Sequence, residues 1–297
     1  MKTIVTHSGP FHADDCFAVA AILLFLAGEE VKVVRTRENS FFYSGDFVVD
    51  VGREYDPKRN RFDHHQLGVE PRENGIPYSS IGLVWKEYGE KIAKNARASK
   101  IVEERLIMPI DAGDNGFDLF TSTNKATSPF TVSSVIGSFM PTSTEEKTFD
   151  EGFFEALEIA KQVLAREILH AIDQVEVEDK FEEAFHVAKD KRIVVLDTSS
   201  TSWKKKALEH KEVLFVVHPY DEGSFSARTV RKEKDGFEAR LSFPDMWAGK
   251  EGEELQMITG VKDAKFCHLK KFVAFANSKE GAVELAEKAL AISKDYL

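Results

Sequence analysis

Apolar runs that lead directly into histidine or aspartate are the feature that most constrains how this chain can fold. Four such places lie in its first 115 residues: His7-Ser-Gly-Pro-Phe-His12-Ala-Asp14-Asp15, Asp50, the triplet Asp63-His64-His65, and Asp111-Ala-Gly-Asp114. A buried carboxylate without a partner is costly, so inward-facing members of this set need a cation. Imidazole and carboxylate without thiolate suit Mn²⁺, Mg²⁺, Fe²⁺ or Co²⁺ better than structural zinc. The pattern outlines a site for two metal ions.

The apolar runs alternate with helical patterns. We expect strands at Thr3–Thr6, Val31–Thr36 and Asp46–Val51, and helices at Asp14–Ala27, Ser79–Tyr88 and Ser99–Pro109, with Gly28 capping the first helix. This alternation predicts βαβ units and a parallel sheet covered by helices. Ligands collect at the carboxyl ends of parallel strands, so His7 and Asp50 should open toward the same crevice.

The second half of the chain changes in character. Helical periodicity over Phe149–Ala171 and Phe181–Ala188 predicts two connecting helices. Further strands are expected at Ile193–Leu196, Leu214–Val217, Phe225–Val230, Ala239–Phe243 and Phe266–Ala276, before a last helix at Lys279–Ile292. We therefore predict an α/β protein with two domains. Residues 1–190 hold the metal site and the helical connector (about 149–190), and residues 191–297 form a smaller mixed α/β domain that binds substrate.

Composition narrows the class of protein. The formal net charge of −10 argues against nucleic-acid binding over the whole surface, although a local basic groove is compatible with it. Two cysteines, Cys16 and Cys267, cannot build a disulfide framework or a CxxC site, which fits a reducing cytoplasm. The opening Met1–Thr6 is too short and polar for a signal peptide, and the apolar run Phe17–Ala27 is too short for a membrane span. We expect a soluble cytoplasmic protein without a membrane partner.

Each polar stretch also has an ordinary structural explanation. A lone histidine after a strand is usually hydrogen-bonded, and Asp14 or Asp15 could be a helix N-cap. Asp50 could be a turn residue that points to solvent, and the triplet a polar loop. Asp111 to Gly116 are the usual residues of a turn after a helix. The collection is more specific than any of its members.

Together these residues resemble the DHH phosphoesterase superfamily and, within it, the melanocyte-proliferating-gene (Myg) family of metal-dependent nucleases. The resemblance covers nearly the whole chain. It is carried by Thr6-His-Ser-Gly-Pro-Phe-His-Ala-Asp-Asp15, by Phe62-Asp-His-His-Gln66, and by a C-terminal region with Arg240-Leu241, Pro244, Trp247, Gly260 and Glu280-Gly281-Ala282. His12 stands where the wider superfamily usually carries aspartate, which agrees with the Myg pattern.

The resemblance implies a hydrolase of phosphoric ester or anhydride bonds that uses two divalent cations, with Mn²⁺ favoured over Mg²⁺ or Co²⁺. One metal would be bound by His7, His12 and Asp50, and the second by Asp14, Asp50, His64 and Asp111, so that Asp50 bridges them. Relatives in the Myg family look like 3′-to-5′ RNA exonucleases. The superfamily's glycine-rich phosphate-binding turn is not matched, because the corresponding stretch here is Phe272-Val-Ala-Phe-Ala-Asn277.

The remaining polar residues are assigned by their chemistry. His65 is expected to contact substrate, since imidazole can donate to a phosphate oxygen or protonate a leaving oxygen near neutral pH. Asp63 would orient a neighbouring histidine. The candidate phosphate contacts are His268, Lys270, Lys271, Arg228, Arg231 and Arg240, for which a solvated basic face is the alternative.

The predicted function is that of a two-metal phosphodiester hydrolase in which Asp50, Asp63 and His65 are catalytic. The enzyme is expected to act as a 3′-to-5′ exonuclease on RNA or short oligonucleotides, as a monomer or a homodimer. The alternatives are a phosphohydrolase of pyrophosphate or a nucleotide, and a non-catalytic module that senses metal or nucleotide. Trp203, Phe243 or Trp247 would favour nucleic acid if they stack on bases, although core packing is the more frequent fate of such residues.

Overall fold

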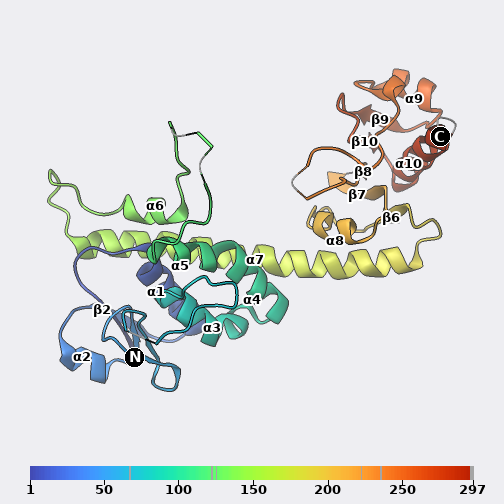
Figure 1. Cartoon of the computed structure of the whole chain (residues 1–297). Helices are drawn as coiled ribbons and strands as arrows, with labels where there is room; N and C mark the ends of the chain where they lie inside the picture. Colours follow the sequence, from blue (N-terminus) through green and yellow to red (C-terminus); the bar gives the residue numbers. More distant parts are fainter. Residues whose placement is uncertain (67, 122, 125, 222, 235, 295–297) are drawn as a thin grey trace. The chain divides into compact units, whose positions relative to one another are not determined.

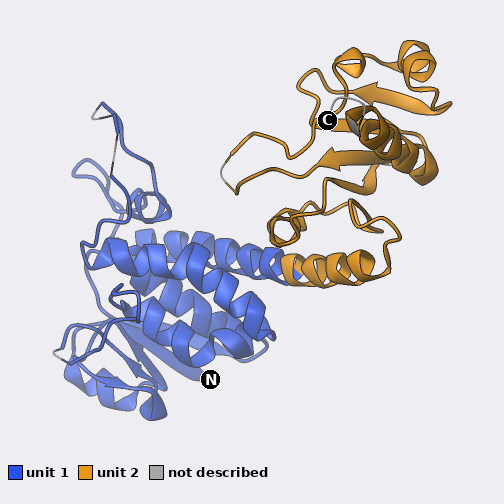
Figure 2. Cartoon of the chain, turned by 45° about the vertical axis from the view of Figure 1, so that its right-hand side comes forward, with its two compact units in different colours: residues 1–172 blue, residues 173–297 orange. Residues whose placement is uncertain are grey.

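The chain folds into two compact units, each built around one sheet (Figures 1 and 2). The computed structural model describes residues 1–66, 68–121, 123–124, 126–221, 223–234 and 236–294, apart from the side chain of Lys294. Unit 1 is Met1–Ile172 and unit 2 is Asp173–Leu297. The α/β class is confirmed. The division falls inside helix α7 (Phe149–Val187), and the domain boundary predicted near residue 190 lies just beyond the end of that helix.

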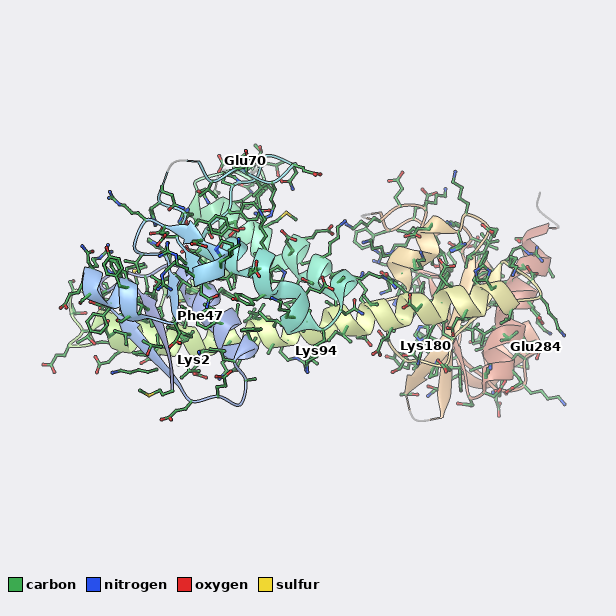
Figure 3. All side chains as sticks on the ribbon, turned by 90° about the horizontal axis from the view of Figure 1, so that it is seen from below. Lys2, Phe47, Glu70, Lys94, Lys180 and Glu284 are labelled. Carbon is green, nitrogen blue, oxygen red and sulfur yellow. The ribbon has the colours of Figure 1, made fainter. Side chains whose placement is uncertain are left out.

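The sheet of unit 1 is parallel except for one edge strand. Its order is β2-β1-β3-β5-β4, and β4 is antiparallel to β5. Lys2 begins β1 and Phe47 begins β3, and both are labelled in Figure 3. The strands are β1 (Lys2–Thr6), β2 (Val31–Arg35), β3 (Phe47–Val49), β4 (Tyr55–Asp56) and β5 (Arg61–Phe62). The parallel sheet is confirmed, and the two-residue strands β4 and β5 carry too little pattern to be predicted.

Helices cover this sheet, and α1 is the most deeply buried of them. Every residue of α1 from Ala13 to Ile22 is buried, which explains why its sequence is apolar on all sides. The remaining helices of unit 1 are α2 (Asn39–Ser44), η1 (Pro57–Arg59), α3 (Ser80–Ala93), α4 (Ala96–Val102), η2 (Glu103–Ile107), α5 (Met108–Asp114), α6 (Val132–Gly137) and the first part of α7; α1 itself spans Ala13–Phe25. The helix predicted at Ser99–Pro109 is part of the continuous run from α4 through α5 and extends to Asp114.

Helix α7 is a single helix of 39 residues where two were predicted. The polar segment between Ala171 and Phe181 contains neither glycine nor proline, so nothing in it ends a helix. Apolar residues anchor the helix at both ends, with Phe153 buried in unit 1 and Phe181 buried in unit 2. Among the described residues, no helix combines the length and the apolar character needed to cross a membrane.

Unit 2 has the predicted mixed sheet, in the order β6-β7-β8-β10-β9, in which only β6 and β7 are parallel. Its elements are β6 (Ile193–Val195), α8 (Lys204–Glu209), β7 (Phe215–Asp221), β8 (Ser224–Thr229), η3 (Asp245–Trp247), α9 (Gly252–Thr259), β9 (Ala264–Cys267), β10 (Val273–Ala276) and α10 (Lys279–Lys294). The strand predicted at Ala239–Phe243 is absent, since only a bridge between Arg231 and Ala239 forms there. The strand predicted at Phe266–Ala276 is instead a hairpin of β9 and β10, with Lys271 in its turn at φ +57°.

The two faces of this sheet belong to different hydrophobic clusters. Phe215 and Val217 face a cluster that contains Leu255 of α9 and Leu285 of α10. Val216, between them, faces a cluster that contains Phe181 of α7. The aromatic residues Trp203, Phe243 and Trp247 lie at most 2% exposed inside these clusters. They are core residues and do not stack on bases.

His218 makes the stability of the chain depend on pH. The ring is 1% exposed; its Nδ1 donates to the carbonyl of Pro219 at 2.8 Å and its Nε2 accepts from the hydroxyl of Ser226 at 3.1 Å. Burial, helped by the charges of Arg228 and Lys204, lowers its pKa from 6.5 to about 4. The unfolded chain therefore binds the extra proton first, and stability present above pH 6.5 is lost as the pH falls toward 4.

We predict that this residue contributes about 2–3 kcal/mol of the stability lost between pH 6.5 and 4. Urea unfolding at several pH values should show the wild type losing that much more than His218→Gln, whose side chain does not titrate. Identical pH profiles of the two proteins would contradict the assignment.

Candidate metal centre

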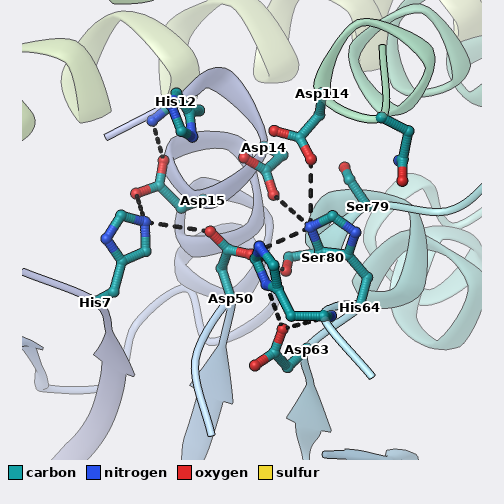
Figure 4. A network of polar contacts seen from close by, with 12 residues as sticks. His7, His12, Asp14, Asp15, Asp50, Asp63, His64, Ser79, Ser80 and Asp114 are labelled. Carbon is teal, nitrogen blue, oxygen red and sulfur yellow. Dashed lines mark hydrogen bonds and ion pairs between the residues drawn. The ribbon is translucent and has the colours of Figure 1, made fainter. Parts of the chain in front are cut away.

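Three neighbouring strand ends and two helix ends gather histidine and aspartate at one edge of the unit 1 sheet (Figure 4). His7 follows β1, Asp50 follows β3, and the triplet that begins at Asp63 follows β5. Because β1, β3 and β5 are adjacent and parallel, their carboxyl ends meet. The start of α1 adds His12, Asp14 and Asp15, and the end of α5 adds Asp114. The predicted opening of His7 and Asp50 toward one place is confirmed.

The carboxylate of Asp50 lies between two histidines. One oxygen is 3.2 Å from Nε2 of His7, and the other is 3.5 Å from Nε2 of His64. The second oxygen also accepts a hydrogen bond from the Ser80 hydroxyl at 3.0 Å. Asp50 is 5% exposed and has φ +54°, a left-handed conformation that costs energy in a non-glycine residue. The chain therefore holds this carboxylate at the centre of the site at the expense of backbone strain.

Two further groups of ligand atoms lie on either side of Asp50. Nε2 of His7 is also 3.2 Å from Asp15. Nε2 of His64 is 3.2 Å from Asp114 and 3.9 Å from Asp14. In three groups of residues, each residue offers one possible metal-ligand atom, and these atoms lie within 4.8 Å of one another. The groups are His7 with Asp15 and Asp50; Asp50 with His64 and His65; and His12 with Asp14 and Asp114.

Several of these atoms are buried without a hydrogen-bond partner among the described residues. Both carboxylate oxygens of Asp14 are in this position, while one oxygen of Asp15 and Nε2 of His64 have only the ion-pair contacts described above. Buried polar atoms are normally paired, so their orphaned state indicates a missing partner. Oxygen and imidazole nitrogen around an excess of carboxylates fit a divalent cation. The donor set therefore fits the metal site that the sequence predicts.

Protonation reflects the same excess of negative charge. Burial works against a charged His7, but hydrogen bonds to Asp15 and Asp50 outweigh it and raise the pKa of His7 to about 10. Burial and the charges of Asp50 and Asp114 raise the pKa of Asp14 well above its usual value. Burial also opposes the charged form of Asp50, but hydrogen bonds from His64 and His7 prevail and lower its pKa. Without metal, protons supply part of the compensating charge.

Asp111, predicted as a metal ligand, does not join the cluster. One of its oxygens accepts from the amide and hydroxyl of Ser79 and from the amide of Gly82, at 2.6 to 3.1 Å. The other lies 2.7 Å from Nη2 of Arg72. Burial raises its pKa to about 6 although Ser79 and Arg72 lower it. The turn predicted there is instead the last turn of α5, which directs Asp114 to His64.

Asp15 and Asp114 are the site residues that our ligand set omitted. Asp15 has two roles, since one oxygen accepts from the amides of His12 and Cys16 at the start of α1 while the other faces His7. The sequence showed both residues but gave no sign of which neighbouring aspartate faces inward. The spacing of Asp111 and Asp114 could have suggested that both lie on one helix face.

His65 and Asp63 form a pair beside the cluster. Nδ1 of His65 lies 2.8 Å from a carboxylate oxygen of Asp63, and the His65 side chain is 57% exposed. Asp63 is 1% exposed, and its other oxygen accepts from the amide of Arg53 at 2.6 Å. The buried carboxylate thus fixes the orientation of a solvent-facing imidazole, as Asp63 was predicted to do for a neighbouring histidine.

The predicted phosphate contacts lie in unit 2 and separate into two kinds. Arg228 and His268 line one hollow, and Arg228 and Arg231 line another. Arg240 instead donates to the carbonyls of Ala207, Leu208, His210 and Val213, at 2.6 to 3.3 Å. Its guanidinium closes the end of α8, so the prediction that it binds substrate has no support in this arrangement.

Known proteins similar in sequence to this chain form one family. The profile of the uncharacterised protein family UPF0160, also described as MYG1 exonuclease, matches residues 3–290. Human MYG1 exonuclease is 28% identical and covers 99% of this chain and 87% of its own length. MYG1 proteins of Dictyostelium discoideum and Saccharomyces cerevisiae are each 29% identical, covering 97% and 98% of this chain and 96% of their own lengths.

A solved structure of RecJ from Thermus thermophilus in complex with Mn²⁺ overlaps 99% of this chain, with a TM-score of 0.31 and 14% identity. The chain spans about half of the length of that structure, 52%.

The different surroundings of the two α5 carboxylates give a prediction. Asp114→Asn should weaken Mn²⁺ binding about 10- to 100-fold with little effect on unfolding, because it removes a charge that faces His64. Asp111→Asn should destabilise the chain by about 3 kcal/mol, because the buried Arg72 guanidinium loses the carboxylate at its Nη2 and keeps as counter-ion only Glu103, which is partly exposed. Isothermal titration with Mn²⁺ and thermal unfolding separate the two effects. A stable Asp111→Asn protein that has lost Mn²⁺ affinity would restore Asp111 as a ligand.

Proposed function

Since the chain belongs to the MYG1 exonuclease family, we propose that it is a two-metal phosphodiester hydrolase that shortens RNA or short oligonucleotides from the 3′ end. The observation that carries the proposal is the Asp50 carboxylate, buried between His7 and His64 with orphaned carboxylate oxygens nearby. That the enzyme acts in the cytoplasm, and that Mn²⁺ is its metal, stay predictions.

The residues that would hold the metals fall on either side of Asp50. His7 and Asp15 would bind one ion with Asp50, while Asp14, His64 and Asp114 would bind the second with it, and His12 lies within reach of Asp14 and Asp114. When bound, two such cations activate water and neutralise the nonbridging oxygens of a phosphodiester. The ligand set requires no protein nucleophile.

We infer that His65 moves a proton at the leaving oxygen. Its Nδ1 faces Asp63, so Nε2 is the nitrogen free to face substrate. The Asp63 carboxylate holds the imidazole ring in this orientation, from which it can donate a proton to an alkoxide as it departs. Ser80 and the Arg53 amide hold Asp50 and Asp63 in place, so that neither carboxylate has to reorganise.

A hollow of about 710 Å³ opens beside the second group of ligands, within unit 1. Its walls include His12, Asp14 and Asp114, and its apolar part includes Phe117 and Phe120, both partly exposed. Sites for small organic groups combine such an apolar wall with a few polar residues. The hollow is large enough to hold the sugar and base attached to the phosphate being cleaved.

Replacing the central carboxylate tests the proposal directly. Asp50→Asn should lower Mn²⁺-dependent cleavage of end-labelled RNA at least 1000-fold while the circular dichroism spectrum is kept, because asparagine tolerates the same backbone conformation. The same assay should include pyrophosphate and bis-p-nitrophenyl phosphate. Cleavage of pyrophosphate alone would move the assignment to a small-molecule phosphohydrolase, and Mn²⁺ binding without any turnover to a sensing module.

His65 gives a separate prediction. His65→Gln should lower kcat for RNA about 100-fold or more, because it removes the proton donor, while the affinity for Mn²⁺ changes less than about threefold. Titration with Mn²⁺ and steady-state kinetics on the same preparation provide both values. A large loss of Mn²⁺ affinity would instead make His65 a ligand together with Asp50 and His64.

A further inference from the structure

In unit 2, helices cover one face of the sheet over only part of its width. On this face Val194 and Val216 pack against Phe181 of α7 and Trp203 before α8. The other part of the same face carries a hollow of about 410 Å³. All of its lining residues come from β7 to β10 and the turn after β9, so no helix of the described part of unit 2 closes it.

Aromatic rings form the floor of this hollow. Phe275 of β10 lies opposite Phe266 of β9 in the sheet register, and their rings stack at 6.3 Å with planes 20° apart. The ring of Tyr220, which is 51% exposed, meets the ring of Phe275 edge-on at 4.7 Å. Such rings on the open side of a sheet give an apolar surface on which unpaired bases can stack.

The charge of the hollow has one sign. Arg228, Lys265 and His268 line it, and none of its described lining residues is acidic, in a chain that has 50 acidic and 40 basic residues. Nε of Arg228 is buried without a hydrogen-bond partner, and no described carboxylate forms an ion pair with this side chain. An unpaired, partly buried guanidinium indicates an anionic ligand.

The positive charge continues beyond Arg228. The same arginine lines a second hollow of about 630 Å³ together with Lys204, Arg231 and Lys270. Partial burial and repulsion from Arg228 and Arg231 lower the pKa of Lys204, which shows how closely these cations lie. Two glutamates also line this hollow, and one of them, Glu238, is paired with Lys232. The cations therefore extend away from the aromatic floor as a strip.

We propose that this open sheet face binds a single-stranded nucleic acid, with bases stacked on Tyr220, Phe275 and Phe266 and phosphates bound by Arg228, Lys204 and Arg231. An aromatic floor beside a strip of cations matches the alternation of base and phosphate in such a strand. An extended peptide would pair with a sheet edge and leave the rings unused. The inference rests on the proposed function, because it names a second contact for the same polymeric substrate.

Binding can be measured without turnover on the full chain, stripped of metal by chelation. Fluorescence anisotropy with labelled oligouridylate should show that Tyr220→Leu and Phe275→Leu each weaken binding about tenfold, the usual effect of losing one stacked base. Tyr43→Leu, which replaces an 83% exposed tyrosine of α2, should bind as the wild type does. Arg228→Gln should reduce the dependence of log K on log salt concentration by about one, as for the loss of one phosphate contact.

An oligomer with abasic sites identifies stacking as the cause. The wild type should bind it more weakly than the intact strand, whereas Tyr220→Leu should distinguish the two less. Tyr220 is exposed, so its variant remains informative even if Phe275→Leu fails to fold. Equal binding of the oligonucleotide by wild type and Tyr220→Leu, or no binding of RNA or DNA strands by either, would overturn the inference.

The nuclease assay separates this inference from the proposed function. If the wild type shortens RNA and Tyr220→Leu binds it unaltered, the proposed binding on the sheet face is wrong and the proposed nuclease function stands. If binding depends on Tyr220 but no RNA is hydrolysed, the proposed binding on the sheet face stands and the proposed nuclease function is wrong. Parallel titrations with oligothymidylate show whether the face distinguishes RNA from DNA.

Discussion

Unit 1 depends on the burial of more carboxylate than cation at one edge of its sheet. Asp14, Asp15 and Asp50 are each at most 5% exposed there, and His7 and His64 are their nearest cationic partners. Charge buried without compensation is strongly destabilising, so either protons or divalent cations must be present. Metal binding at this edge would therefore be coupled to proton release and to the order of β3 and β5, which end here, and of α1, which begins here.

The buried carboxylate of Asp111 supports the metal centre without being one of its ligands. Asp111 binds the start of α3 through Ser79 and Gly82, and Arg72, which also pairs with Glu103, neutralises it. A Cβ on Gly82 would lie 2.0 Å from the Asp111 carboxylate, so only glycine allows this approach. The arrangement fixes α5 against α3. It thereby sets the direction of Asp114, one helical turn later, toward His64.

The sequence predicted what depends on local pattern. The Val-rich runs of β1 to β3 indicated a parallel sheet, and the order of strands and helices predicted that His7 and Asp50 open toward one place. That His64 of the triplet joins them came only from the family resemblance. What depends on distant contacts could not be predicted. The choice between Asp111 and Asp114 is made by Arg72, far earlier in the chain, and Arg240 is taken from substrate by carbonyl groups around α8. The sequences next to Asp111 and Arg240 have no special pattern, so no periodicity could show the partners of these two residues.

The left-handed backbone at Asp50 restricts which residues position 50 can accept. Glutamate would keep the charge, but a longer side chain at φ +54° loses the conformational tolerance that aspartate and asparagine share. Glycine would relieve the backbone strain and asparagine would tolerate the same backbone conformation, but both would abolish the charge. Backbone geometry and charge are thus two independent requirements, and among the twenty amino acids aspartate alone meets both of them. In a library of all substitutions at position 50, variants that only satisfy the backbone requirement would fold, and only aspartate would also be active.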